Sequence, residues 1–185
     1  MSDWSALHDE GVRLAADGDV AGARAALEAA LTSAPREHRP HVLVNLAHVV
    51  DLAGERQLAA DLLTEAIGAG DGEVRVMALA SRADLLPWLD RWDEAWRDVE
   101  GALVDVDEVG EVVLRTSRVS LLMAAGRLAE AEAEATRTVD LAARHAPEYL
   151  ENLYAGLALL ADEAGDERRA AMYRLLSANP GRQPL

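Results

Sequence analysis

The chain has 185 residues, half of them hydrophobic, which is enough apolar material for one domain or a short repeat array. It contains no cysteine, which excludes disulfides, thiolate zinc sites and cysteine nucleophiles. All 18 basic residues are arginine, and the net charge of −15 disfavours nucleic acid as a partner because phosphate backbones would be repelled. No apolar run approaches the roughly 18 residues of a transmembrane helix, and the polar N-terminus is unlike a secretory signal. We therefore expect a cytoplasmic protein with no membrane partner.

Apolar residues recur at spacings of three and four from the N-terminus onward, which predicts helices, and no stretch alternates as a strand would. The first turn is preceded by Leu7, Gly11 and Leu14 and followed by Ala23 and Leu27. The same arrangement returns four more times, so we expect helix–turn–helix pairs over residues 4–37, 40–72, 74–108, 111–145 and 148–178. Residues 1–180 are expected to form a single domain, and 181–185 a frayed tail.

One motif marks every pair: a turn residue followed five positions later by alanine. The turns begin at Gly18, Gly54, Asp90, Gly126 and Gly165, and the alanines are Ala23, Ala59, Ala95, Ala131 and Ala170. Glycine ends a helix because it accepts left-handed backbone angles at little cost. An alanine one turn into the second helix lets the two helices of a pair approach closely.

These residues resemble the tetratricopeptide repeat (TPR) family, whose repeats carry a 34-residue pattern of small and large residues. Repeat one shows the match best, with Leu7, Gly11, Leu14, Gly18, Asp19, Ala23, Leu27, Ala30 and Pro35 at the family's spacing. Repeat four is poorer, because Arg115 and Thr138 replace a large apolar residue and an alanine. The resemblance covers residues 4 to 178. It implies an all-α fold, a right-handed α-solenoid of about ten antiparallel helices in five helix–turn–helix pairs.

The resemblance also implies a binding surface, because the first helix of each pair lines a concave groove in this family. Carried over by position, the groove residues are His8, Val12, His41, Asn45, His48, Met77, Ser81, Asp84, Trp88, Ser117, Ser120 and Met123. Chaperone-tail binders of the family grip a terminal carboxylate with lysine, asparagine and arginine. This chain has no lysine and only Asn45 resembles that set, which disfavours such a partner.

Three polar residues, His41, Asn45 and His48, share one face of one predicted helix, and His8 is expected on the neighbouring helix. A histidine cluster can bind a transition metal, but a polar patch that contacts a partner, or plain structure, is the commoner use. We predict no metal and no cofactor.

Two arginines, Arg82 and Arg118, stand 36 residues apart at a repeat position where leucine is usual, and Arg115 lies one turn from Arg118. Each needs a carboxylate, water or an anionic ligand, since an unpaired buried charge is costly. Ion pairs with nearby acids and a small anion-binding spot both remain open. Trp88 and Trp96 are likewise open between packing and exposed anchors for a partner.

Catalytic motifs are lacking: the sequence has no Gly-rich phosphate loop, nucleophile elbow or paired-histidine zinc helix. We therefore predict a non-enzymatic scaffold or adaptor that binds a peptide or helix of another protein. A homodimerisation module and a regulator that senses a small anion or metal are the alternatives. The segment 90–111 holds nine acids and two arginines, and is either a solvated surface or a docking patch for a basic partner.

Overall fold

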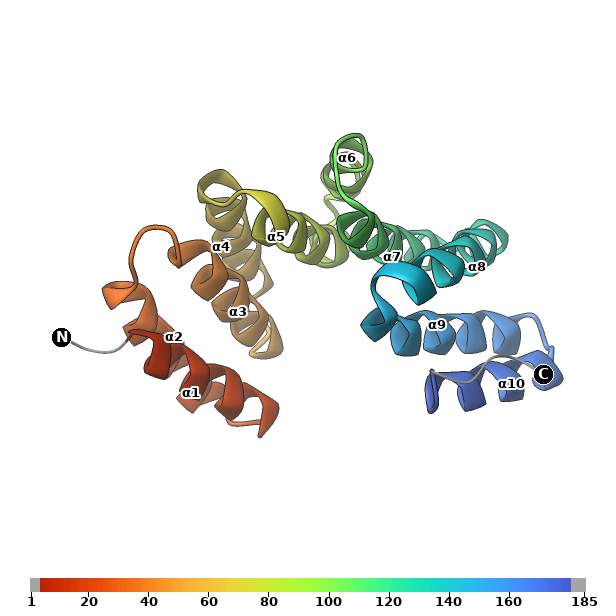
Figure 1. Ribbon diagram of the computed structural model, residues 1–185, viewed down its shortest axis with the longest axis horizontal. Coiled ribbons are helices and arrows are strands. Elements are labelled where there is room, and N and C mark those ends of the chain that lie inside the picture. Colours follow the sequence, from red (N-terminus) through yellow and green to blue (C-terminus); the bar gives the residue numbers. More distant parts are fainter. Residues whose placement is uncertain (1–3, 181–185) are drawn as a thin grey trace. The chain divides into compact units, whose positions relative to one another are not determined.

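The computed structural model describes residues 4–180, and this part of the chain is all-α, with no strand (Figure 1). The all-α prediction is thereby confirmed for the described residues. The predicted frayed tail, 181–185, lies outside them. No helix within 4–180 combines the length and apolar character needed to cross a bilayer.

The chain divides into two compact units, the first ending at Trp92 and the second starting at Asp93. The helices of the first unit are α1 (Trp4–Ala16), α2 (Val20–Ser33), α3 (Arg39–Leu52), α4 (Arg56–Ala69), α5 (Gly72–Leu85) and the 3₁₀ helix η1 (Leu86–Leu89). The boundary falls just inside α6 (Trp92–Ala102). The second unit continues with α7 (Glu108–Ala124), α8 (Leu128–His145), the 3₁₀ helix η2 (Pro147–Tyr149), α9 (Leu150–Glu163) and α10 (Glu167–Ser177). That all the repeats form a single domain stays a prediction.

All five predicted turns adopt the same backbone conformation. The φ angles are 83° at Gly18, 85° at Gly54, 58° at Asp90, 71° at Gly126 and 71° at Gly165. At the second turn, the Gly54 N–H donates to the Asp51 carbonyl at 2.8 Å and the Glu55 N–H donates to the Val50 carbonyl at 2.9 Å. The other four turns repeat this pair of bonds. Each turn therefore ends its first helix with the two crossing bonds of a Schellman motif.

The small residues of the motif lie where the helices of a pair meet. All five motif alanines are fully buried. Gly11 of α1 is also buried, and a Cβ added there would lie 2.6 Å from Cγ of Leu27 on α2. Since real Cβ contacts are never that short, only glycine permits this spacing of α1 and α2.

Helix contacts show how consecutive pairs stack within each unit. Besides its partner α4, α3 contacts both α1 and α5, and in the second unit α7 contacts α9 as well as α8. The first helices of successive pairs are therefore direct neighbours. They form a continuous row in each unit.

A proline interrupts one helix, and another helix begins earlier than the sequence predicts. Pro87 lacks a backbone N–H, so α5 stops at Leu85 and the chain continues as the 3₁₀ helix η1. Helix α7 begins at Glu108, three residues before the start expected for the fourth pair. The Asp107 side chain caps this helix by accepting a 2.8 Å hydrogen bond from the Gly110 N–H.

Candidate interaction surface

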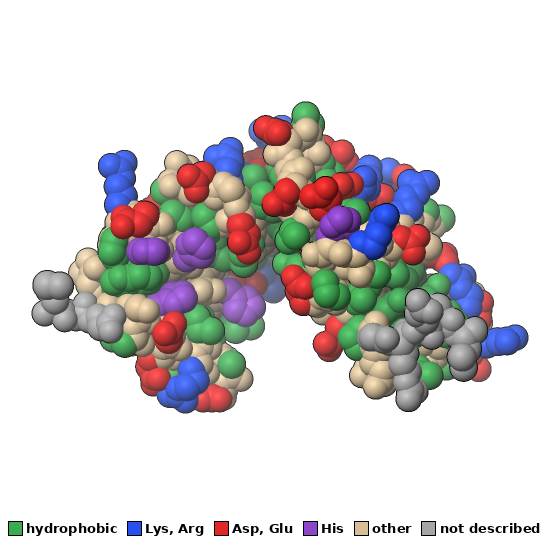
Figure 2. Space-filling view, viewed as in Figure 1, with side chains coloured by type: hydrophobic (Ala, Val, Ile, Leu, Met, Phe, Trp, Pro, Cys, Tyr) green, Lys and Arg blue, Asp and Glu red, His purple; other side chains and the backbone are tan. Residues whose placement is uncertain are grey.

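The exposed side of α1, α3, α5 and η1 in the first unit carries most of the predicted groove residues; we call it the odd-helix face. Val12, His41, His48, Met77, Ser81, Asp84 and Trp88 are exposed, whereas His8 and Asn45 are half-buried. Histidine side chains gather over the helices of this unit (Figure 2). The face therefore exposes polar side chains and aromatic rings together with Val12 and Met77, while the opposite sides of α3 and α5 supply buried apolar residues.

Two predicted residues from different helices meet at the near end of this face. Asn45 Nδ2 of α3 donates to His8 Nε2 of α1 at 2.7 Å. His8 Nδ1 lies 3.5 Å from Asp9 Oδ1, and the His8 side chain is only 20 % exposed. This hydrogen bond orients both side chains and leaves the amide oxygen of Asn45 as an acceptor.

A shallow pocket of about 260 Å³ lies further along the face, between α3, α4 and α5. Its apolar lining consists of Val44, Ala47, Ala59, Leu63 and Leu85, and its polar lining of Asn45, His48, Asp51 and Ser81. The pocket is smaller than the roughly 300–1,000 Å³ typical of drug-sized ligand sites, so its size suits a single side chain better than a cofactor.

Trp88 stands beside this pocket region with 70 % of its surface exposed, the most exposed tryptophan of the described chain. The Arg56 guanidinium carbon lies 4.6 Å from the centre of the Trp88 ring. Arg56 Nε in turn lies 3.8 Å from Asp51 Oδ1, so Arg56 connects the tryptophan to the pocket wall. An exposed tryptophan held by a cation–π contact is the kind of anchor found at binding hot spots.

The predicted residues of the second unit offer less surface. Ser117 is buried and Met123 is half-buried, while Ser120 is exposed. Burial leaves the Ser117 side chain little access to a partner, which argues against its predicted role. Trp96 packs against the buried cluster of Leu122, Ala131 and Leu160. Of the two roles considered for this residue, packing and partner binding, the structure shows packing.

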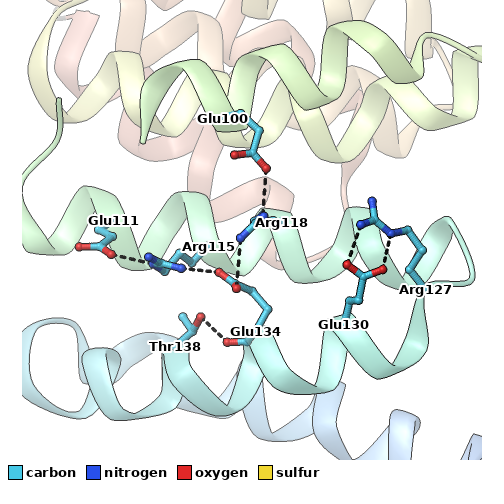
Figure 3. Close-up of polar contacts among 8 residues, drawn as sticks. All are labelled: Glu100, Glu111, Arg115, Arg118, Arg127, Glu130, Glu134 and Thr138. Atoms are coloured by element: carbon cyan, nitrogen blue, oxygen red, sulfur yellow. Dashed lines mark hydrogen bonds and ion pairs between the residues drawn. The ribbon is translucent and has the colours of Figure 1, made fainter. Parts of the chain in front are cut away.

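Two of the three candidate anion-binding arginines are already paired with acids (Figure 3). Arg115 Nη1 donates to Glu134 Oε1 at 2.6 Å, and Arg118 Nη1 donates to Glu134 Oε2 at 3.2 Å. Glu111 pairs with Arg115 at 2.7 Å and Glu100 with Arg118 at 3.0 Å. With three carboxylates around two guanidiniums, an incoming anion would be repelled, so an anion site here is disfavoured. The sequence left ion pairs and an anion-binding spot as alternatives for these arginines, and at Arg115 and Arg118 the structure shows ion pairs.

The pKa of Arg115 reflects this arrangement. Burial acts to lower the pKa of the guanidinium, but hydrogen bonds to Glu111 and Glu134 outweigh burial and raise it above its ordinary value. The third arginine, Arg82, lies in the first unit, where its Nη1 donates to Thr64 Oγ1 at 2.7 Å. The guanidinium of Arg82 therefore has at least one neutral partner on α4.

Comparison with solved structures places the fold. BtubC (BKLC) from P. vanneervenii is 18% identical with a TM-score of 0.64, over 93% of this chain and 79% of that one. A Podosopora anserina kinesin light chain-type protein with nearly identical TPR-like repeats is 18% identical with a TM-score of 0.65, over 99% and 100%. A TPR protein from Parabacteroides merdae ATCC 43184 is 18% identical with a TM-score of 0.50, over 98% and 80%.

The chain has the TPR fold. The fold class expected from the sequence is thereby confirmed, with ten α-helices in the described residues. Neither a protein-family model nor any curated protein matches the sequence. Stacked repeats of this kind present an extended surface.

In the described residues, no group of three or more His, Asp or Glu side chains is placed to hold a metal ion. His8 is engaged by Asn45, and Trp4 stacks on His38 with ring centres 4.5 Å apart. Two of the five histidines in the sequence, His8 and His38, thus already have contacts within the first unit.

Sequence reasoning missed three residues that shape these sites: Asp51, Arg56 and Glu134. Asp51 follows His48 by three positions on α3, so helical spacing alone could have placed it on the same face. Glu134 and Asp98 are both buried acids, and they stand 36 residues apart at the same position of their TPR repeats. That recurrence of an acid three positions after the motif alanine was a usable signal. Arg56 carried no comparable signal.

Proposed function

We propose that this protein is a scaffold for protein–protein interaction, and that an extended peptide or a helix of a partner protein lies on the odd-helix face of the first unit. The observation that carries the proposal is Trp88, a large, exposed aromatic side chain held beside a side-chain-sized pocket. Exposed tryptophans next to pockets are characteristic of binding hot spots, where one anchor supplies much of the affinity.

The chemistry of the face fits peptide binding in two further ways. His41 and His48 are exposed along α3, and Ser81 along α5, so donors and acceptors are available to a peptide backbone at several points. Neighbouring first helices hold these groups in fixed positions, which lowers the ordering cost that a partner must overcome. We propose a binding role and no catalytic one, as expected from the sequence.

The test is a selection of displayed random dodecapeptides on the purified chain, followed by affinity measurements on the enriched peptides. Binding is compared between wild type, the double variant His48→Ala/Trp88→Ala, and a matched control, Gln57→Ala/Glu65→Ala. The control residues are exposed on α4, which is not one of the helices that define the odd-helix face. We expect the groove variant to lose at least about tenfold in affinity, the scale of a hot-spot residue.

The control variant should bind within twofold of wild type, and both variants should keep the wild-type melting temperature. Equal loss in the two variants, or none in either, would mean that the odd-helix face is not the binding surface. Light scattering on the same samples tests the homodimer alternative, since a dimer that dissociates on mutation would assign these residues to self-association.

A further inference from the structure

We propose that the pocket on the odd-helix face binds an arginine or lysine side chain of the partner, with its charged end on the Asp51 carboxylate. This inference rests on the proposed function, since it names the chemistry that a docked peptide needs. Nothing in the comparisons assigns a ligand to these residues.

The lining of the pocket matches the two parts of a long basic side chain. Its apolar residues come from all three helices and would pack against an aliphatic stem. Its polar residues are rich in acceptors: the Asp51 carboxylate, the Ser81 hydroxyl and the amide oxygen of Asn45, whose amide nitrogen is engaged by His8. A guanidinium or ammonium carries only donors, so acceptors are what it requires.

The Asp51 carboxylate has unused bonding capacity. Its Oδ1 is buried and accepts no hydrogen bond from the described residues. The nearest cation is Arg56, whose Nε lies at 3.8 Å, beyond hydrogen-bond distance, and whose guanidinium lies over the Trp88 ring. Oδ1 itself is closed off from solvent, so an incoming basic side chain would bond to the exposed part of the carboxylate, where a charge-assisted hydrogen bond is stronger than a neutral one.

The Asp51 side chain can still be reached from solvent, because 41 % of its surface is exposed. A basic side chain entering the pocket would therefore meet the open part of the carboxylate first. Asp84 is exposed one helical turn beyond Ser81 on α5, and the chain as a whole carries a charge of −15. These charges attract a cationic segment and repel an acidic one.

Other occupants fit less well. An acidic side chain would place its charge against Asp51, whose carboxylate Arg56 already faces. An apolar side chain would fill the floor but would cover Asp51 without offering a donor, which adds a desolvation cost. A basic side chain is the only class that satisfies both the apolar floor and the acidic rim.

The experiment is an NMR titration of the ¹⁵N-labelled chain with the blocked pentapeptide Gly-Gly-Arg-Gly-Gly. Two probes of the same length carry citrulline or glutamate in place of arginine. We expect saturable shifts at the amides of Asn45, His48 and Ser81 with the arginine peptide. Citrulline keeps the shape but not the charge, and should bind at least about fivefold more weakly, as expected for loss of one charge-assisted contact.

Asp51→Asn should weaken the arginine peptide by the same factor and leave the citrulline peptide unchanged. The matched control is Asp61→Asn, which removes the same charge from an exposed position of α4 and should change binding less than twofold. A second variant, Ser81→Lys, places a cation of the chain's own at the rim and should block the pocket. If Asp51→Asn lowers the melting temperature, the Ser81→Lys variant tests the pocket in its place.

Several results would overturn the proposal: equal binding of the arginine and citrulline peptides, equal effects of Asp51→Asn and Asp61→Asn, or no saturable shift at the pocket amides. Its failure is separable from that of the proposed function. Suppose that display-selected peptides depend on Trp88 but tolerate both Asp51→Asn and replacement of their own basic residues. That result would support the scaffold function and reject the proposal that the pocket binds a basic side chain. If the selected peptides bind equally well without Trp88 and without Asp51, the odd-helix face is not the binding surface.

Discussion

Asp90 and Gly54 stand 36 residues apart and share one left-handed backbone conformation, with φ of 58° and 85°. Gly54 follows α3 and Asp90 follows η1, and both turns have the same pair of crossing hydrogen bonds. An L-residue pays roughly 1–2 kcal/mol for this conformation, although aspartate pays less than most because its short polar side chain bonds locally. Asp90 is the only described non-glycine residue with positive φ.

Replacing Asp90 with glycine should therefore raise the free energy of unfolding by about 0.5–1 kcal/mol, part of the gain being offset by the extra entropy of glycine in the unfolded chain. The matched change Asp90→Ala should lower it by a similar amount, since alanine lacks the polar side chain that makes left-handed angles tolerable. Urea denaturation followed by circular dichroism measures both. A destabilising Asp90→Gly would show that the aspartate contributes contacts that outweigh its backbone cost.

Two helical glycines should respond in opposite directions to alanine. Gly11→Ala places a Cβ 2.6 Å from Leu27 Cγ, and forcing α1 from α2 should cost about 1–3 kcal/mol despite the better helix propensity of alanine. Gly68 on α4 has open space around its Cβ position, so Gly68→Ala should stabilise by about 0.5–1 kcal/mol. Melting temperatures of the two variants give the test. If both changes stabilise, α1 and α2 are not held by the close approach at Gly11.

Glu134 should be a far more sensitive position than the other acids of α8. Its side chain is 5 % exposed and pairs with both Arg115 and Arg118. Glu134→Gln keeps the shape but leaves two arginines facing a neutral group, and should destabilise by about 1–3 kcal/mol. The control Glu130→Gln removes an exposed acid paired with Arg127 and should shift the denaturation midpoint far less, because exposed ion pairs contribute little. Equal midpoints for the two variants would contradict the role assigned to Glu134.

The pKa of Glu130 should lie below its ordinary value of 4.5, because the hydrogen bonds and charge of Arg127 favour the carboxylate and outweigh desolvation. A depressed folded-state pKa means that this pair contributes stability above the unfolded pKa and loses it as the pH falls through the folded pKa. Carboxyl-carbon NMR titration measures the pKa directly. Arg127→Gln should return it towards 4.5, whereas Arg137→Gln, an exposed arginine of the same helix, should leave it in place. A normal pKa in the wild type would mean that the Arg127 pair does not persist in solution.

The helix pairs and their turns could be predicted from the sequence because their causes are local. A glycine, or here an aspartate, that tolerates positive φ ends one helix within a few residues of its own position. The alanine five positions on is buried for an equally local reason, since it lies one turn into the next helix on the side that faces the first. Such features recur along the chain, at intervals of 36 residues three times and 39 once, and this spacing is visible without any knowledge of distant contacts.

The partners of the polar side chains were decided by tertiary structure. Arg115 and Arg118 are recognisable in the sequence as charges at apolar positions, but Glu134 reaches them from the next helix, 19 and 16 residues away. Ser117 is buried and Ser120 exposed on one helix, because it is neighbouring helices that decide which polar side chain is covered. The pocket at Asp51 likewise exists only where α3, α4 and α5 meet. A repeat sequence determines which way each backbone turns, whereas the pairing of side chains depends on helix separations and rotations that no single repeat specifies.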